Sequence, residues 1–225
     1  MTEWWTYRPE HFLLFSERVY WRLLELYNAE LWPWQAGALL IGVFVLYLSW
    51  RPYPRSGVLI SGVMGLLWLI VAWSYLWSHY ATINWAATYM AGAFVVQGIL
   101  WIVIGVPGKR FQMSAQTGIR RSLGGGMVLY AVVIHPFAAI VIGRFPAASE
   151  VFGLTPDPLV IASLGMLVLS RINRMNLILW LLPCLWCLVS GVTLMTMGSP
   201  TALVLLLSPL IALVAIIVAK YQKPA

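Results

Sequence analysis

Charged residues are scarce in this sequence. Asp, Glu, Lys and Arg make up 9% of its 225 residues, whereas in soluble domains they make up about a quarter. Hydrophobic residues make up 61%, and the mean hydropathy is +0.85. These values exclude an ordinary soluble domain.

The sequence also lacks the common catalytic and metal-binding motifs. It contains no His-Glu-x-x-His and no Gly-x-Ser-x-Gly, which argues against a metalloprotease or a serine hydrolase. Cys184 and Cys187 are its two cysteines, too few to complete a zinc site, and they suit an apolar core. The glycine run at 124–126 lacks the Lys and Ser/Thr of a phosphate-binding loop. We therefore expect neither an enzyme nor a bound cofactor.

Most of the sequence consists of long apolar segments. A bilayer core about 30 Å thick needs about 20 apolar residues per helix. We predict an all-α polytopic membrane helix bundle with about seven transmembrane helices, in which an outer-face segment, 1–34, precedes the bundle, 35–225. The N-terminus has no basic region and no cleavage site, so we do not expect a signal peptide. The candidate spans are residues 35–50, 57–78, 84–106, 124–143, 155–170, 175–195 and 200–219.

The charges separate by sign along these segments. With seven crossings, residues 51–56, 107–123, 171–174 and 220–225 share one side, and they hold ten Lys/Arg and no acid. The other side holds four arginines and all seven carboxylates. The positive-inside rule then places the C-terminus in the cytoplasm and the N-terminus outside. Insertion and attraction to an anionic membrane surface explain the net charge of +7, so we expect a lipid bilayer as partner and no nucleic acid.

Residues 16–32 have the pattern of an amphipathic helix, with Ser16 as its N-cap. Polar side chains occupy one arc, and apolar side chains, among them Val19 and Leu26, fill the rest. Such a helix would lie on the outer membrane surface or over the mouth of the bundle. Glu30 falls in the apolar arc. Either the helix frays and Glu30 lies among the lipid headgroups, or its carboxylate turns toward the bundle.

The segment 155–170 is too short to cross a membrane. With Asp157 as N-cap and Pro158 at the first helical position, it has about 13 helical residues, or about 20 Å of helix. The preceding residues 150–156 would then enter the membrane as non-helical chain, buried against protein. Short or broken spans of this kind point to the binding site of a transporter.

Two ionisable residues are predicted at membrane depth. His135 lies about 12 Å from the outer end of its segment, and Asp157 reaches a similar depth if residues 144–157 dip inward. A His–Asp pair could bind a cation or relay protons, because histidine titrates near neutral pH and a nearby carboxylate tunes it. Alternatively, His135 bonds to a neighbouring helix and Asp157 only caps its own.

Further polar and aromatic residues gather at the predicted outer ends of the spans. Asn84, Glu150, His79 and Glu30 complete the candidate site there, and Asn84 is expected to pair across the mouth. The nearby aromatic rings form either a belt at the headgroup level or a cage for a cation. These rings belong to Trp73, Tyr75, Trp77, Tyr80, Trp85 and Tyr89.

Three stretches resemble an uncharacterised family of bacterial multi-pass membrane proteins, whose members are sometimes labelled permeases. They are Trp-Trp-Thr-Tyr-Arg-Pro-Glu at 4–10, Ala-Thr-Ile-Asn-Trp-Ala at 81–86, and Glu-Val-Phe-Gly-Leu-Thr-Pro-Asp-Pro at 150–158. The resemblance implies a location in the bacterial inner membrane and carries no established activity. All three stretches fall on the outer side in the predicted topology.

The leading functional hypothesis is a small-solute or cation binding protein of the permease type, with a polar site that opens outward. Asp157 and His135 would form its core, Asn84 and Glu150 its mouth, and the aromatic rings its walls. The alternative is a non-catalytic membrane scaffold or sensor whose helix at 16–32 docks a partner. A third hypothesis, an intramembrane enzyme that acts on lipid with His135 as base, lacks any recognised nucleophile or metal set.

Overall fold

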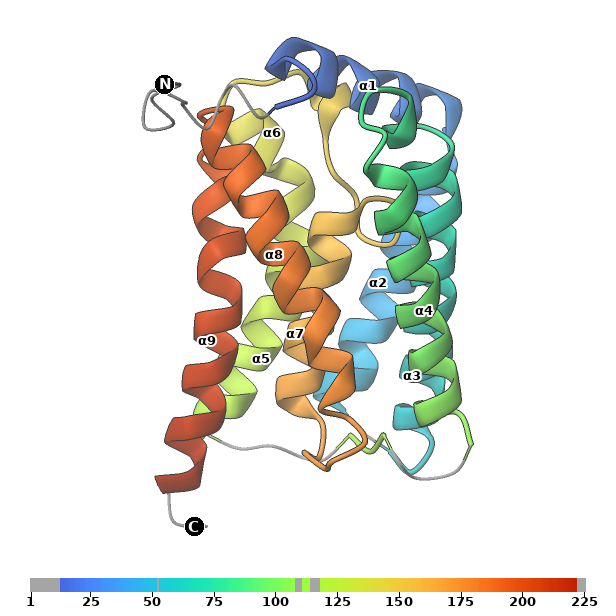
Figure 1. Cartoon of the computed structure of the whole chain (residues 1–225). Helices are drawn as coiled ribbons and strands as arrows, with labels where there is room; N and C mark the ends of the chain where they lie inside the picture. The colour runs from blue at the N-terminus through green and yellow to red at the C-terminus, as the bar shows by residue number, and fades with distance from the viewer. Residues whose placement is uncertain (1–12, 52, 108–110, 114–117, 222–225) are drawn as a thin grey trace, which may run out of the picture.

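The computed structural model describes residues 13–51, 53–107, 111–113 and 118–221, with side chains up to residue 219. The predictions about the first twelve residues, including the N-terminal resemblance, lie outside it. The described residues form helices and connections without a sheet (Figure 1). The helices are α1 (Glu17–Glu30), α2 (Trp34–Trp50), α3 (Ser56–Ile70), α4 (Ala87–Gly105), α5 (Gly118–Leu129), α6 (Ala138–Val141), α7 (Pro156–Leu169), α8 (Ile178–Thr196) and α9 (Thr201–Tyr221).

Several helices are long and apolar enough to cross a membrane. Among the described residues five pass this test, and a sixth span results if α1 and α2, which meet at 92°, are joined. Two of them include more than one kind of helical turn: α3 continues through the π-helix η3 (Val71–Trp77), and α5 through the π-helix η5 (Tyr130–Ile134). The structure thus supports an all-helical membrane protein with five or six spans by length. Of the seven predicted segments, 35–50 and 155–170 form α2 and α7, which are shorter.

Helix α7 forms the centre of the bundle. All of its 14 residues are buried, and it packs against α3, α5, α8 and α9 (Figure 1). A helix that is apolar all round is stable only where protein or lipid surrounds it on every side. Here the surrounding material is protein, so α7 holds a fixed position inside the ring of longer helices.

Small residues allow the helices around α7 to approach closely. A Cβ atom added to Gly165 would lie 2.7 Å from the carbonyl oxygen of Gly124, so α5 and α7 touch backbone to backbone. The same holds for α3 and α4, where a Cβ on Gly65 would lie 2.8 Å from the Gly98 oxygen. In lipid such close packing takes the place of the hydrophobic effect as the force between helices.

The chain before α7 enters the bundle without helical structure, as predicted for residues 150–156. Every residue from 150 to 170 is buried, and Gly153 makes the required turn with a φ of +80°. The helix begins two residues earlier than predicted, because Thr155 is the N-cap residue and Pro156 occupies the first turn. Asp157 is therefore not the cap. Its carboxylate is free to bond elsewhere.

Helix α1 lies across one end of the bundle, called here the α1 end (Figure 1). Ser16 is its N-cap, as predicted, and its hydroxyl accepts a hydrogen bond from the amide of Val19 at 3.4 Å. The face that meets the bundle carries Tyr20, Leu23, Leu24 and Tyr27. Two residues of the predicted apolar arc are instead exposed: Val19 at 42% and Leu26 at 55%. The apolar surface of α1 is therefore only partly used against the bundle.

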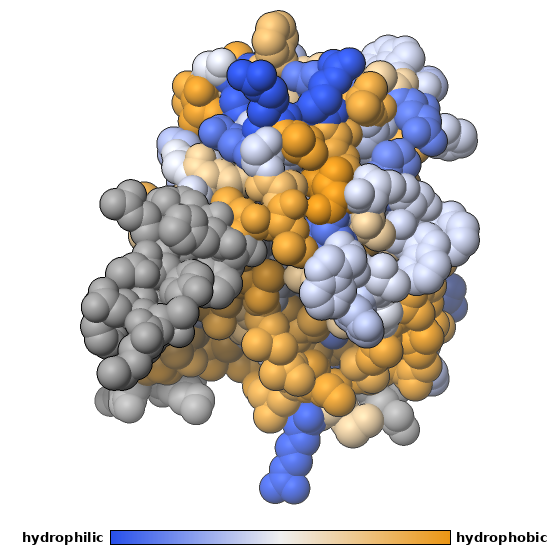
Figure 2. All heavy atoms as spheres, turned by 45° about the horizontal axis from the view of Figure 1, so that its top comes forward, coloured by the Kyte–Doolittle hydropathy of each residue, from blue (hydrophilic) through white to orange (hydrophobic). Residues whose placement is uncertain are grey.

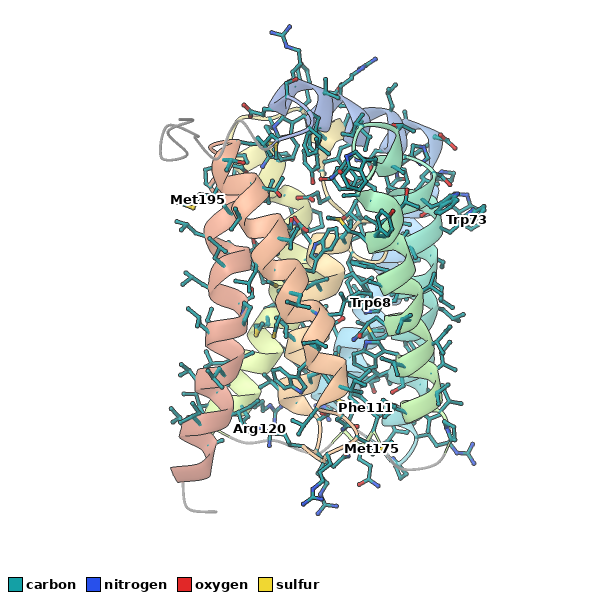
Figure 3. All side chains as sticks on the ribbon, in the orientation of Figure 1. Trp68, Trp73, Phe111, Arg120, Met175 and Met195 are labelled. Carbon is teal, nitrogen blue, oxygen red and sulfur yellow. The ribbon has the colours of Figure 1, made fainter. Side chains whose placement is uncertain are left out.

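The outer surface of the bundle is polar at the α1 end and apolar along its sides. Figure 2 shows hydrophilic atoms gathered at the α1 end and hydrophobic atoms over the sides. Trp73 points away from the bundle, whereas Trp68 points into it (Figure 3) and donates to the hydroxyl of Ser163 at 3.0 Å. Trp77, Trp85 and Tyr89 are likewise exposed. Four of the six predicted aromatics are thus exposed, as a belt would require, and Tyr75 and Tyr80 are buried.

Candidate functional site

His135 and Glu150 form a buried pair at the α1 end of the bundle. His135 begins the short 3-10 helix η6 (His135–Phe137), where Pro136 interrupts the α-helical hydrogen bonds of the fourth span. Its Nε2 atom lies 3.3 Å from Oε2 of Glu150, and the two side chains are 1% and 5% exposed. Two alternatives were predicted for His135, a pair with Asp157 or a hydrogen bond to a neighbouring element. The hydrogen-bond contact of its imidazole is with Glu150, which precedes α7 on the non-helical chain, and Asp157 interacts with it electrostatically.

Asp157 is bound by two neutral donors of α8. The indole Nε1 of Trp186 donates to its Oδ1 at 2.7 Å, and the hydroxyl of Ser190 lies 2.8 and 2.9 Å from its two oxygens. The start of α7 adds the favourable field of a helix N-terminus. Among the described residues Asp157 takes part in no ion pair. The Asp157 and Glu150 carboxylates repel each other, and His135 attracts that of Asp157.

Three polar atoms of this region are buried without a hydrogen-bond partner among the described residues. They are Nδ1 of His135, Oε1 of Glu150 and the hydroxyl oxygen of Tyr75. Most buried polar groups in proteins are paired, because an unpaired one costs about 1–3 kcal/mol. The free atoms on the histidine and the glutamate show that the centre has unused capacity to hold a further polar group or ion.

A small cavity adjoins this centre. Its volume is about 40 Å³, which is room for about three water molecules and far below the roughly 300–1,000 Å³ of sites for organic ligands. Tyr20 closes it from the side of α1, and burial, with the nearby Tyr75, Glu150 and Asp157, raises the pKa of Tyr20 well above its usual value. Its hydroxyl therefore stays neutral. The cavity is lined by Tyr20, Tyr75, Tyr80, Asn84, Met90, Trp186, Val189, Ser190, Thr193 and Leu194.

Asn84 lies at this cavity but bonds locally. Its Oδ1 accepts from the amide of Ala86 at 3.1 Å, two residues along the chain, at the entrance to α4. Its side chain also interacts with the hydroxyl of Tyr80, four residues earlier. Among the described residues no hydrogen bond of Asn84 across the mouth is found. Asn84 therefore shapes the wall of the cavity and the start of α4.

His79 and Glu30 form a separate pair at the surface of the α1 end. Nε2 of His79 lies 3.0 Å from Oε2 of Glu30, and its Nδ1 lies 2.6 Å from the carbonyl oxygen of Ser74. The Glu30 side chain is 68% exposed. Of the two alternatives for Glu30, neither holds alone, because its carboxylate is solvent-exposed and also bonded to the bundle. This pair links the end of α1 to the turn after η3 and is not part of the buried centre.

The buried centre includes residues that the sequence did not single out. Trp186 and Ser190 are four residues apart on α8, so they share one face of that helix. A serine in an otherwise apolar span is a usable signal, because a hydroxyl at that depth needs a partner. Cys184 and Cys187 on the same helix are free thiols. Neither forms a hydrogen bond with the carboxylates among the described residues, although Cys187 lies near enough to Asp157 to interact with it electrostatically.

Tyr20 and Tyr27 tie α1 to the same region. The hydroxyl of Tyr27 donates to the carbonyl oxygen of Leu154 at 2.8 Å and lies 2.9 Å from that of Ser74. Asn28 donates to the carbonyl oxygens of Ala147 and Ser149 at 2.7 and 2.8 Å. Helix α1 thus rests directly on the chain segment that carries Glu150.

The donor set at the centre limits what it could hold. Across the residues that the structure describes, no three His, Cys, Asp or Glu side chains are grouped as a metal ion would require. Two carboxylates, one imidazole and several hydroxyls remain, which are oxygen-rich ligands suited to hard cations and to protons.

Fold and site together define an all-helical membrane protein with a buried ionisable centre at one end of the bundle. The chain belongs to DUF6064, a family of unknown function whose model matches residues 17–225. This confirms the expectation of an uncharacterised family. The comparison with curated proteins finds no match, and the comparison with solved structures finds none either.

Proposed function

We propose that this protein is a permease-type protein that takes up a proton or a small monovalent cation at its buried centre, where Glu150 pairs with His135 and Asp157 bonds to Trp186 and Ser190. The observation that carries the proposal is the charge of the centre. With both carboxylates ionised, one imidazole leaves it negative even when the ring is protonated, because the next cation, Arg144, interacts with Glu150 but forms no ion pair with it among the described residues. A buried charge without a counter-charge is costly. A bound cation would remove that cost and would use the free oxygen of Glu150.

The size of the adjoining cavity, which Trp186 and Ser190 help to line, favours the smaller of the two ligand classes of the sequence-based hypothesis. A space of about 40 Å³ supports a cation or proton with a few waters, and a larger solute has no room in this conformation. The short central helix supports the same proposal, because in transporters half-length helices with their ends at membrane depth often contribute the ion site.

The proposal includes a membrane topology. The protein would lie in the bacterial inner membrane with seven crossings, α2 and α7 included. The α1 end would face outward and the C-terminus the cytoplasm, as the distribution of Lys and Arg indicates. The buried centre would then lie in the outer half of the membrane, with α1 as its cover.

A thermal-shift titration of the purified protein in nanodiscs tests the cation site. A ligand that binds only the folded state stabilises it by about 2.7 kcal/mol at one hundred times its Kd. Sodium or potassium should raise the melting temperature if an alkali ion binds, and a pH dependence without a sodium effect indicates a proton. Asp157→Asn and Glu150→Gln should both abolish the response.

Glu25→Gln is the matched control, because Glu25 is a carboxylate of α1 that pairs with Arg22 at 2.7 Å at the surface. It should leave both titrations unchanged. The proposal is wrong if the two buried variants respond to ions and pH as the wild type does. Proteoliposomes that carry an ion-sensitive dye then decide whether binding leads to transport.

One observation favours the alternative of a scaffold or sensor. Val19 and Leu26 of α1 are exposed, and with His79, Thr82 and Ile83 they line an apolar pocket of about 380 Å³. If this surface docks a partner protein, Leu26→Glu should release the partner, whereas Asp157→Asn should not affect it. The cation proposal predicts the opposite pattern for the ion response: Asp157→Asn should abolish it, and Leu26→Glu should leave it unchanged.

A further inference from the structure

A groove opens on the side of the bundle between α5 and α9. Both helices belong to predicted spans, so the groove faces the hydrocarbon of the membrane. Its volume is about 370 Å³, within the range of small-molecule sites, and Ile161 of the buried helix α7 contributes to its lining. The groove is lined by Ser122, Leu123, Gly126, Met127, Tyr130, Ile161, Leu203, Val204, Leu207, Ser208 and Ile211.

Gly126 keeps this groove open. It is the third of three consecutive glycines in α5, and the first two have packing reasons: Gly124 meets α7, and Gly125 meets the indole of Trp50. A Cβ on Gly126 would have no atom within 4 Å. Glycine inside a helix costs up to about 1 kcal/mol relative to alanine. No packing contact requires a glycine at position 126. The absence of a side chain there therefore leaves the groove next to it unfilled.

Tyr130 supplies the polar end of the groove. The hydroxyls of Ser122 and Ser208 donate to carbonyls of their own helices, whereas the hydroxyl of Tyr130 makes no hydrogen bond among the described residues. Its ring packs edge-on against His135 with 5.6 Å between centroids. Tyr130 follows the first residue of α5 by twelve positions, or about 18 Å, which is near the middle of a hydrocarbon core about 30 Å thick.

The depth of Tyr130 identifies the kind of ligand that fits. A phospholipid brings only hydrocarbon to the middle of the bilayer and cannot accept a hydrogen bond there. A ligand that satisfies Tyr130 must carry its polar group into the hydrocarbon on an apolar tail. We propose that the groove binds a lipid-soluble molecule of the quinone type, with a ring carbonyl that accepts from Tyr130 and an alkyl or isoprenoid tail along α9.

This site is distinct from the proposed cation site. It uses none of His135, Glu150 or Asp157 as a ligand, although Tyr130 touches His135. The two proposals can therefore fail separately. Asp157→Asn should abolish the ion response and leave quinone binding unchanged.

Photocrosslinking in phospholipid nanodiscs tests the groove. The probe is an alkyl benzoquinone with a diazirine on its tail, and its attachment sites are mapped by mass spectrometry. We expect attachment to α5 and α9 within the groove, and competition by unlabelled alkyl benzoquinone. Tyr130→Phe should weaken binding about fivefold, the effect of one neutral hydrogen bond. Gly126→Leu should fill the groove and abolish saturable labelling.

Gly92→Leu is the matched control. Gly92 lies inside α4, is exposed, and also has no atom within 4 Å of an added Cβ, but it lines none of the described pockets. The proposal is overturned if Gly126→Leu labels like the wild type or if Gly92→Leu loses labelling equally. It is also overturned if a diazirine phosphatidylcholine labels the groove and quinone does not compete. If Gly126→Leu does not fold, the affinity of Tyr130→Phe decides alone, and an unchanged affinity contradicts the proposal.

Discussion

Arg120 and Asp157 lie at opposite ends of the buried helix α7. The guanidinium of Arg120 donates through Nε to the carbonyl oxygen of Val168 at 2.9 Å and also bonds the carbonyl of Ser170, at the end of α7 remote from α1 (Figure 3). Asp157 occupies the first turn. A negative charge at the N-terminus of a helix and a positive charge at its C-terminus both interact favourably with the helix dipole. The two residues therefore stabilise a helix that is buried along its whole length.

Removal of the Arg120 charge should destabilise the protein. Arg120→Gln loses charge-assisted bonds to two carbonyls that α7 leaves free, at a cost of about 2–3 kcal/mol. In a chain of this size that corresponds to a fall of about 4–12 °C in melting temperature. Thermal unfolding in detergent measures it. Arg121→Gln, at an exposed neighbouring position, should change the melting temperature by less than about 2 °C, and an equal fall in both variants contradicts the role of Arg120.

The position of α7 could be predicted from sequence, but its cap could not. The short apolar segment with prolines at its start indicates a helix that begins below the surface. Thr155 and Asp157 are both good N-cap residues, and the choice depends on tertiary contacts. Trp186 and Ser190 bind the Asp157 carboxylate and so remove it from the cap. Arg120 belongs to another helix, and nothing in the local sequence indicates that it binds the end of α7.

Asn28 should hold the segment before Glu150 in place. Its two hydrogen bonds join α1 to the carbonyls of Ala147 and Ser149, and Asn28→Ala removes both, at a cost of about 1–3 kcal/mol to local stability. Hydrogen exchange of residues 145–151 should become faster while exchange in α7 stays unchanged.

Arg18→Ala is the control variant for Asn28→Ala. Arg18 also belongs to α1 but is exposed, and none of its side-chain contacts joins α1 to this segment. Its substitution should leave hydrogen exchange at 145–151 at the wild-type rate. The docking role of Asn28 does not hold if exchange there is the same in both variants.

The contact between α5 and α7 should be intolerant of a single methyl group. A Cβ at residue 165 would lie 2.7 Å from the oxygen of Gly124, so Gly165→Ala should cost about 1–3 kcal/mol through forced separation of the helices. Gly126→Ala, two residues beyond the contact, meets nothing within 4 Å. It should keep or slightly raise stability. Denaturation of the two variants in detergent compares them, and equal stability would show that the two helices can separate freely.

The residues that form the candidate site were harder to predict than the positions of the helices. Glu150 and Asp157 lie in one short stretch, and sequence spacing does not give the depth that each reaches. His135 therefore could not be assigned to Glu150 in advance. In α1 the hydrophobic pattern could not distinguish Tyr20, which faces the bundle, from Leu26, which is exposed, because both sides of this helix are apolar. Of the cavity tyrosines, Tyr75 and Tyr80 were expected only as part of an aromatic group, and Tyr20 only as part of the helix at 16–32.

The proposed orientation can be tested with single cysteines at the two ends of the bundle. Arg18 on α1 and Arg171 after α7 are both exposed, and Cys184 and Cys187 can be replaced by alanine to give a background without thiols. If the α1 end faces outward, Arg18→Cys should react with a membrane-impermeant maleimide in intact cells. Arg171→Cys should react only after the membrane is opened. Reaction of both in intact cells means that the two ends do not lie on opposite sides of the membrane, which contradicts the proposed topology. The reverse pattern inverts the topology, in which case the buried centre would lie in the inner half of the membrane and the cation would have to enter from the cytoplasm.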